Sequence, residues 1–146
     1  MDFQLQMDWP TSRTQWRGIK NRLANFRPMA TALGRQMEHW ASRNFSTEGA
    51  MLDEFPSGWP KLSAATLERK RRQGQGTRIL HGTGRLAQGT VVLPQADGIV
   101  MDNPVPYAAR HHLGQGVPRR PVLPSPAQAQ RIALPAVKSH VQEALS

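Results

Sequence analysis

An apolar stripe near the N-terminus constrains the fold of this chain more than any other feature. Large apolar side chains recur every three or four residues, at Trp16, Ile19, Leu23, Phe26, Met29, Leu33, Met37 and Trp40. This spacing places them along one face of a helix. Pro28 interrupts the run, because proline lacks the N–H that an inner helical turn needs. Since the stripe keeps its phase across Pro28, we expect either one kinked helix or two nearly collinear helices over residues 12–44.

Two segments have the pattern of β-strands. At the N-terminus, apolar and polar residues alternate, which is typical of a half-buried strand and predicts one over residues 2–9. Later in the chain, β-prone residues at 91–93 and 99–101 flank a turn-forming Asp-Gly pair. This arrangement predicts an antiparallel hairpin over residues 88–102.

Shorter helices and loops make up the rest of the chain. Glycine and proline punctuate residues 45–62, which we expect to form a long loop held by aromatic side chains. A serine can cap a short helix over residues 63–73. A proline- and arginine-rich arm is expected at residues 114–126. Residues 127–145 have helical character, with Pro135 as a break or restart.

Together these elements predict one α+β domain over residues 1–146. In it, a long N-terminal helix, kinked or divided at Pro28, packs on a small and mostly antiparallel sheet. A C-terminal helical segment and extended loops or arms complete the fold. The chain has twelve Gly and twelve Pro, which suits arms that become fixed against neighbouring subunits. We therefore expect the protein to assemble with other chains.

Composition excludes several kinds of function. The chain has no cysteine, which excludes disulfides, a thiol nucleophile and cysteine-based zinc sites, and which fits a reducing cytoplasm. No apolar run approaches the ~18 residues of a membrane span, and we expect no signal peptide. Neither the number nor the spacing of the histidines, His111 and His112 included, supports a metal site. We expect no cofactor, no metal and no membrane partner.

The residues give no positive support for catalysis. Asp53 and Glu54 lie side by side in the long loop, and no carboxylate has a histidine or serine at a spacing that implies pairing. Residues 81–85, His-Gly-Thr-Gly-Arg, lack the Gly-Lys-Ser/Thr ending of a phosphate-binding loop. We interpret them as a tight turn after a strand-like segment at 78–80. The protein is expected not to be an enzyme.

Positive charge is a further functional signal. Nineteen Lys and Arg against ten Asp and Glu give a net charge of +9, which suits phosphate backbones or acidic protein surfaces. The densest cluster consists of Arg69, Lys70, Arg71 and Arg72. This cluster is either a solvated helix face or a contact with DNA or an acidic partner. No helix-turn-helix or zinc-finger spacing is present, so any DNA contact would be electrostatic and salt-sensitive.

Four short motifs, taken in order, resemble a known family. They are Phe-Pro-Ser-Gly-Trp-Pro-Lys-Leu-Ser at 55–63, Ile-Leu-His-Gly-Thr-Gly-Arg-Leu at 79–86, Tyr-Ala-Ala-Arg-His-His-Leu-Gly at 107–114 and Pro-Arg-Arg-Pro-Val-Leu at 118–123. The ordered set resembles the Mu-like phage virion morphogenesis family, also called tail completion proteins. Arg120 and Val122 stand where that family has Ala and Phe.

The resemblance implies a non-enzymatic structural protein of the phage head-tail junction. Such a protein completes the tail or neck so that filled heads and tails join. The implied partners are further copies of the chain in a homo-oligomeric ring, neighbouring head-tail connector or tail proteins, and packaged double-stranded DNA in the channel. The implied location is the virion, with assembly in the host cytoplasm. The alternatives are a sequence-independent basic DNA-binding protein and, as a third class, an enzyme such as a nuclease or cell-wall hydrolase.

The resemblance also suggests individual residues. Trp59 and Leu62 match the family's Trp-Pro-x-Leu feature, and we expect them, together with Tyr107, to anchor the loop or to form a subunit interface. Simple core packing is the alternative, because large aromatic side chains serve both purposes. Arg119 and Arg120 are further interface candidates, since their neighbouring prolines can fix an extended arm against the next subunit.

Overall fold

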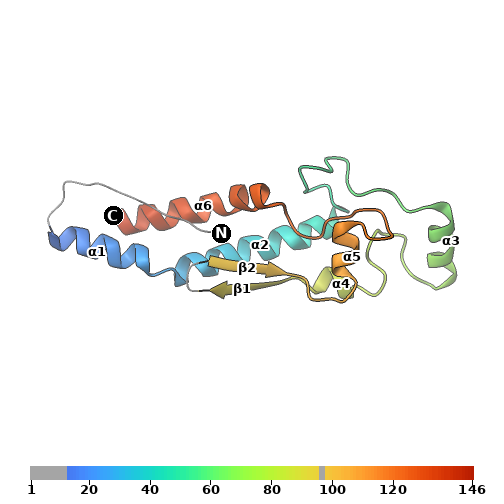
Figure 1. Cartoon of the computed structure of the whole chain (residues 1–146), viewed down its shortest axis with the longest axis horizontal. Helices are drawn as coiled ribbons and strands as arrows, with labels where there is room; N and C mark the ends of the chain where they lie inside the picture. Colours follow the sequence, from blue (N-terminus) through green and yellow to red (C-terminus); the bar gives the residue numbers. More distant parts are fainter. Residues whose placement is uncertain (1–12, 96–97) are drawn as a thin grey trace.

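The computed structural model describes residues 13–95 and 98–146. The elements are α1 (Arg13–Ala24), α2 (Arg27–Ser46), α3 (Ala64–Arg72), α4 (Arg85–Gln88), β1 (Val91–Gln95), β2 (Gly98–Asp102), α5 (Ala108–Leu113) and α6 (Pro126–Leu145). This confirms the expected α+β class. Figure 1 shows an elongated molecule with α1 and α2 roughly in line and α6 running back along them. The strand expected at 2–9 lies outside the described residues.

The long N-terminal helix is divided just before Pro28. Helix α1 ends at Ala24, and α2 begins at Arg27 with Pro28 in its first turn. Proline is tolerated there, because the first N–H groups of a helix have no partner within the helix. The two nearly collinear helices are therefore the arrangement that forms. Four stripe residues of α2 are buried, namely Met29, Leu33, Met37 and Trp40.

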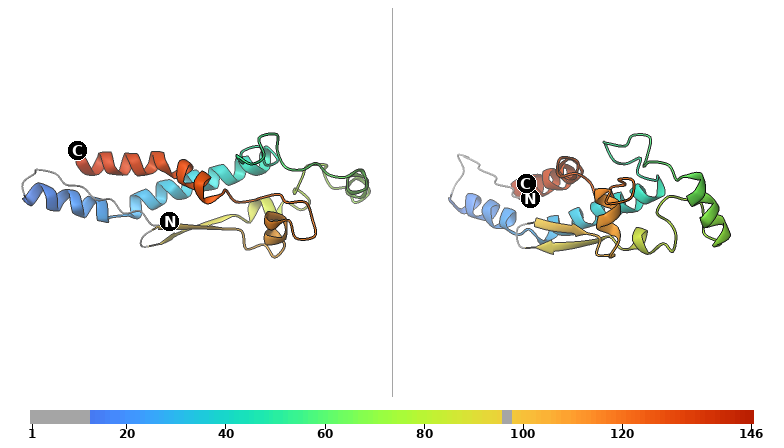
Figure 2. Two further views of the ribbon diagram at one scale, coloured as in Figure 1. Left: turned by 45° about the horizontal axis from the view of Figure 1, so that its top comes forward. Right: turned by 45° about the vertical axis from the view of Figure 1, so that its right-hand side comes forward.

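Helix α2 lies between α6 on one side and the hairpin on the other (Figures 1 and 2). From α6, Ala133 and Ala136 pack against the stripe, and their small side chains allow the two helices to approach closely. From the hairpin, Val92 and Met101 cover the opposite side. The sheet is two-stranded and antiparallel, with Val92 opposite Met101. The hairpin begins at Val91 and not at residue 88, because Gln88 is the last residue of α4.

Pro135 does not break the C-terminal helix, so the expected break or restart is wrong. Helix α6 runs without interruption from Pro126 to Leu145. Its start is capped by Ser125, whose side chain accepts a hydrogen bond from the Gln128 N–H. The buried contacts of the alanines that flank Pro135 hold the helix together despite the missing N–H. Among the helices of the described ranges, none is both long and apolar enough to cross a membrane.

Candidate binding cleft

Trp59 closes the long loop over the core. Its side chain is 1% exposed, and its ring meets the Phe45 ring edge-to-face at a centroid distance of 5.5 Å. The indole Nε1–H donates a hydrogen bond to the Pro121 carbonyl oxygen at 2.9 Å. Gly49 lies against the ring, where an added Cβ would come within 2.4 Å of it. The structure thus places Trp59 inside the molecule, between the loop and the arm.

The arm is bound to the loop through its two arginines. Arg119 pairs with both carboxylate oxygens of Glu54, at 2.8 and 3.2 Å, on the surface. Arg120 is 5% exposed and donates to the carbonyl oxygens of Pro60 at 2.9 Å and Lys61 at 3.2 Å. We call these contacts, with the Trp59 hydrogen bond, the loop-arm junction. In this chain both arginines contact the loop of their own subunit.

Leu62 and Tyr107 occupy less buried positions. Leu62 is half-buried and packs against the core. Tyr107 is 38% exposed and precedes α5, where its ring meets the His111 ring edge-to-face at 6.2 Å. Tyr107 therefore presents part of its ring to the surface.

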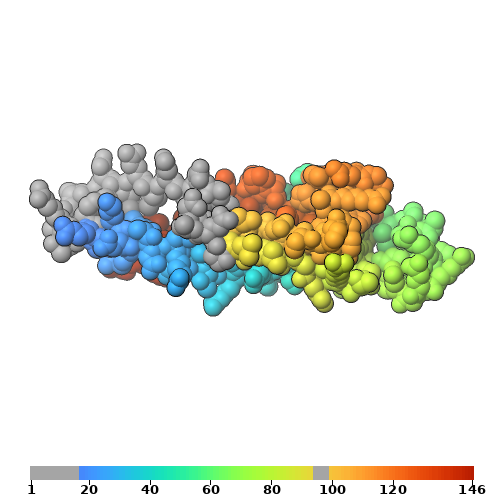
Figure 3. All heavy atoms as spheres, turned by 60° about the horizontal axis from the view of Figure 1, so that its bottom comes forward, coloured from blue at the N-terminus to red at the C-terminus, as the bar shows by residue number. Residues whose placement is uncertain are grey.

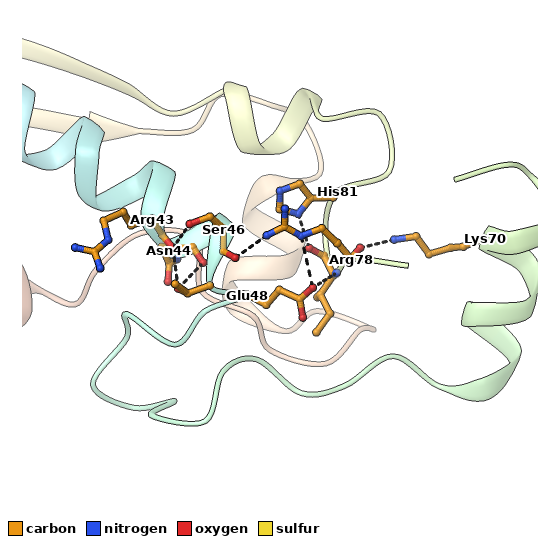
Figure 4. Close-up of polar contacts among 9 residues, drawn as sticks. Arg43, Asn44, Ser46, Glu48, Lys70, Arg78 and His81 are labelled. Atoms are coloured by element: carbon orange, nitrogen blue, oxygen red, sulfur yellow. Dashed lines mark hydrogen bonds and ion pairs between the residues drawn. The ribbon is translucent and has the colours of Figure 1, made fainter. Parts of the chain in front are cut away.

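The basic run of α3 does not form one surface, because a helix distributes consecutive side chains around its axis. Lys70 is 6% exposed, and its Nζ donates to the Arg78 carbonyl oxygen at 2.6 Å (Figure 4). Arg72 pairs with Glu68 on the outer surface. Arg69 and Arg71 are exposed. The four residues thus have different environments.

The segment that carries the Arg78 carbonyl is a turn, and the strand-like interpretation of residues 78–80 is wrong. The Ile79 N–H donates a hydrogen bond to the Glu48 carboxylate at 3.3 Å. In a strand, this N–H would instead donate to a neighbouring strand. Leu80 adopts a positive φ of 59°. Gly84 has a φ of 79° just before α4, as the tight-turn interpretation requires.

A cleft of about 540 Å³ lies between α3, the turn that leads to α4, the start of α5 and the arm. Figure 3 shows α3 at one end of the molecule, next to the yellow and orange segments that carry α4 and the arm. The basic residues of the lining are Lys61, Arg69, Lys70, Arg85, His111 and Arg120. Its larger apolar residues are Leu62, Leu80, Leu86, Tyr107, Val117 and Pro118. No carboxylate is among the described residues that line it. We call it the basic cleft.

Only some of the predicted site residues line the basic cleft. Leu62, Arg69, Lys70, Tyr107 and Arg120 line it, whereas Trp59, Arg71, Arg72 and Arg119 do not. Sequence reasoning missed Lys61, Arg85 and His111. Each of the three lies inside one of the short family-like motifs. The motifs could therefore have indicated these residues, but only the fold shows that the motifs meet at one cleft.

Burial makes positive charge costly on the inner basic residues of the cleft. It lowers the pKa of Lys70 and of Arg120, because desolvation disfavours the charged form. The pKa of His111 is also lowered, first by burial and then by Arg120 and Arg110. In the described part of the chain, no group of three or more metal-ligating side chains could hold a metal ion. The basic lining of the cleft gives it an electrostatic character that suits an anionic group.

Comparison with protein families gives one match. The model of the phage virion morphogenesis family covers residues 9–143, which is nearly the whole chain. Comparisons with curated proteins and with solved structures gave no match. The family match confirms the resemblance seen in the ordered motifs. The chain belongs to the phage virion morphogenesis family.

Proposed function

We propose that the protein is a structural subunit of the phage head-tail junction, where it completes the tail or neck so that filled heads and tails join. The observation that carries this proposal is the family match over residues 9–143. The role is non-enzymatic and needs no cofactor. Its proposed location is the neck or tail end of the virion, and its proposed partners are neighbouring connector or tail proteins.

The proposed assembled form is a homo-oligomeric ring. Rings form when one surface of a subunit binds a different surface of the next and the rotation closes. The outer face of the hairpin offers one such surface, because Leu93 and Val100 lie opposite each other and are 53% and 39% exposed. Exposed apolar patches of this kind are typical of contacts between proteins.

A sequence-independent DNA-binding role is the second candidate, and the exposed arginines of α3 favour it. Of Arg69, Arg71 and Arg72, only Arg72 has an ion pair among the described residues. Phosphate contacts release counterions, so binding would weaken steeply as salt rises. Replacing the run at 69–72 with Gln would then flatten the salt dependence of duplex retardation. An unaltered salt slope would count against DNA contact at α3.

Electron microscopy of phage lysates tests the junction role. The phage carries an interrupted reading frame for this protein, and a plasmid supplies the protein in the control. Without the protein, filled heads should accumulate apart from tails, and the supplied protein should restore joined particles. Joined and infectious particles in its absence would contradict the proposal and favour the DNA-binding role.

A further inference from the structure

Two buried cations of the basic cleft have no carboxylate partner among the residues that the structure describes. Lys70 and Arg120 are 6% and 5% exposed, yet their hydrogen bonds go to backbone carbonyl oxygens alone. Neither takes part in an ion pair within residues 13–95 and 98–146. Buried Lys and Arg side chains usually have an ionic partner, because burial of an uncompensated charge is costly.

The nearby acidic residue does not supply this partner. Glu48 attracts Lys70, but its carboxylate accepts the Ile79 N–H at 3.3 Å and lies 4.0 Å from Arg78 (Figure 4). The attraction is also insufficient to offset the desolvation of Lys70, whose pKa stays lowered. The cleft therefore keeps a surplus of positive charge.

The rim of the cleft adds positive charge that is open to solvent. Lys61, Arg69 and Arg85 are exposed and line the cleft, and none has an ion pair among the residues described. They come from three separate segments of the chain. A ligand with several anionic groups could pair with all three rim residues at once. A single surface arginine offers only one such contact.

The apolar lining distinguishes between the possible anions. Leu62, Leu80 and Leu86 contribute to the same cleft, and its volume of about 540 Å³ falls within the range of ligand pockets. A peptide can carry apolar side chains between its carboxylates. Duplex DNA presents phosphates and sugars on its outside, and these offer nothing to fill a cleft with leucine in its lining.

We propose that the basic cleft binds an acidic peptide segment of a neighbouring assembly protein. Carboxylates of the segment pair with Arg69 and Arg85 at the rim, and its apolar side chains contact the leucines. The choice of an assembly protein as the source rests on the proposed function. The binding itself is measured with purified protein and does not depend on that function.

The experiment measures binding of a fluorescein-labelled dodecapeptide of Glu-Leu-Glu-Ala repeats by fluorescence anisotropy. The same peptide with Gln in place of Glu tests the need for charge, and a labelled DNA duplex tests for phosphate. The test variant combines Arg69→Gln and Arg85→Gln. The matched control combines Arg71→Gln and Arg72→Gln, which removes the same charge from α3 outside the cleft lining.

The proposal expects the Glu peptide to bind about tenfold or more tightly than the Gln peptide, a difference of about 1.4 kcal/mol. The test variant should lose about tenfold in affinity, and the control variant less than about twofold. Equal binding of the two peptides, equal losses in the two variants, or tighter cleft-dependent binding of the duplex would each overturn it. Separate heads and tails in the interrupted phage would still support the junction role, so the two proposals fail independently.

Discussion

The two regions of this molecule differ in how far a local sequence pattern specifies their contacts. The helical region, made of α1, α2, α6 and the hairpin, packs apolar side chains around α2. The loop-rich region, made of residues 47–90 and 103–125, packs apolar side chains around Trp59 and adds buried side chains that donate to carbonyl oxygens some sixty residues away. Periodicity specifies the first region locally. The second forms only when distant segments meet, and it contains the basic cleft.

Among the changes considered, loss of the Trp59 side chain in the loop-rich region should lower the unfolding free energy the most. Trp59→Ala removes a fully buried ring and leaves the Pro121 carbonyl without its indole donor, so we expect a loss of about 3–5 kcal/mol in unfolding free energy. Denaturant unfolding of the purified protein measures it. Trp59→Phe should recover part of the loss, since it keeps a ring without the N–H. Unchanged unfolding together with lost assembly would instead place Trp59 at a subunit interface.

Overpacking of the α2-α6 contact should destabilise the helical region. Ala133 is 0% exposed, so Ala133→Leu forces the helices apart and should cost about 1–3 kcal/mol in unfolding free energy. The neighbouring change Leu134→Ala is the control, because Leu134 is 46% exposed. Thermal unfolding should show a clear fall for the first variant and little change for the second. Equal effects would mean that α6 does not pack on α2 through its alanines.

Acid should weaken the loop-rich region through His112. Its Nδ1 accepts hydrogen bonds from the N–H groups of Val122 at 3.2 Å and Leu123 at 3.4 Å, which needs a neutral ring. Burial, followed by Arg119, lowers the pKa of His112 in the folded state. The unfolded chain then binds protons more readily, so this contribution to stability is present above the ordinary pKa of about 6.5 and is lost as pH falls through the lower folded value.

Denaturant unfolding from about pH 8 down to about pH 5 measures this effect. His112→Asn is the control, because its side-chain oxygen accepts a hydrogen bond without titrating in this range. The variant should show a shallower fall in stability, with the remainder due to His111, whose pKa is also lowered. Identical pH profiles would exclude His112 as the source.

The smallest effect is expected at the exposed end of the loop-arm junction. Arg119→Gln removes the pair with Glu54, whose pKa the Arg119 hydrogen bond lowers. Both side chains are about half exposed, so water and salt screen their attraction. We expect a slight fall in melting temperature that disappears at high salt. A large and salt-independent fall would show that Arg119 contributes by packing over Phe55, 5.7 Å from its ring centroid.

The sequence predicts the helical region better than the loop-rich one. The spacing of the stripe indicates α2, and β-prone runs around a turn indicate the hairpin. Pro135 misleads, because its local helix-breaking tendency is outweighed by the tertiary contacts of Ala133 and Ala136. Periodicity finds a helix face, but it contains no information about which carbonyl an arginine reaches.

The candidate site shows the same limit. The charge run on α3 includes Arg69, which lines the basic cleft, yet Lys70 beside it is buried and bonded to a carbonyl. Arg120, an expected interface residue, is buried against the loop of its own chain. Arg85 also lines the cleft, although the glycines of its motif indicate only a turn. Such assignments depend on contacts between segments some sixty residues apart, as with Arg120 and Pro60.

The most direct test of the central claim, that the protein joins heads to tails through its loop-rich region, is electron microscopy of the interrupted phage supplied with cleft variants. The account predicts separate heads and tails with Arg69→Gln and Arg85→Gln combined, and joined particles with the matched control of Arg71→Gln and Arg72→Gln. Circular dichroism should show that both variants fold. Equal numbers of joined particles from both variants would contradict the account.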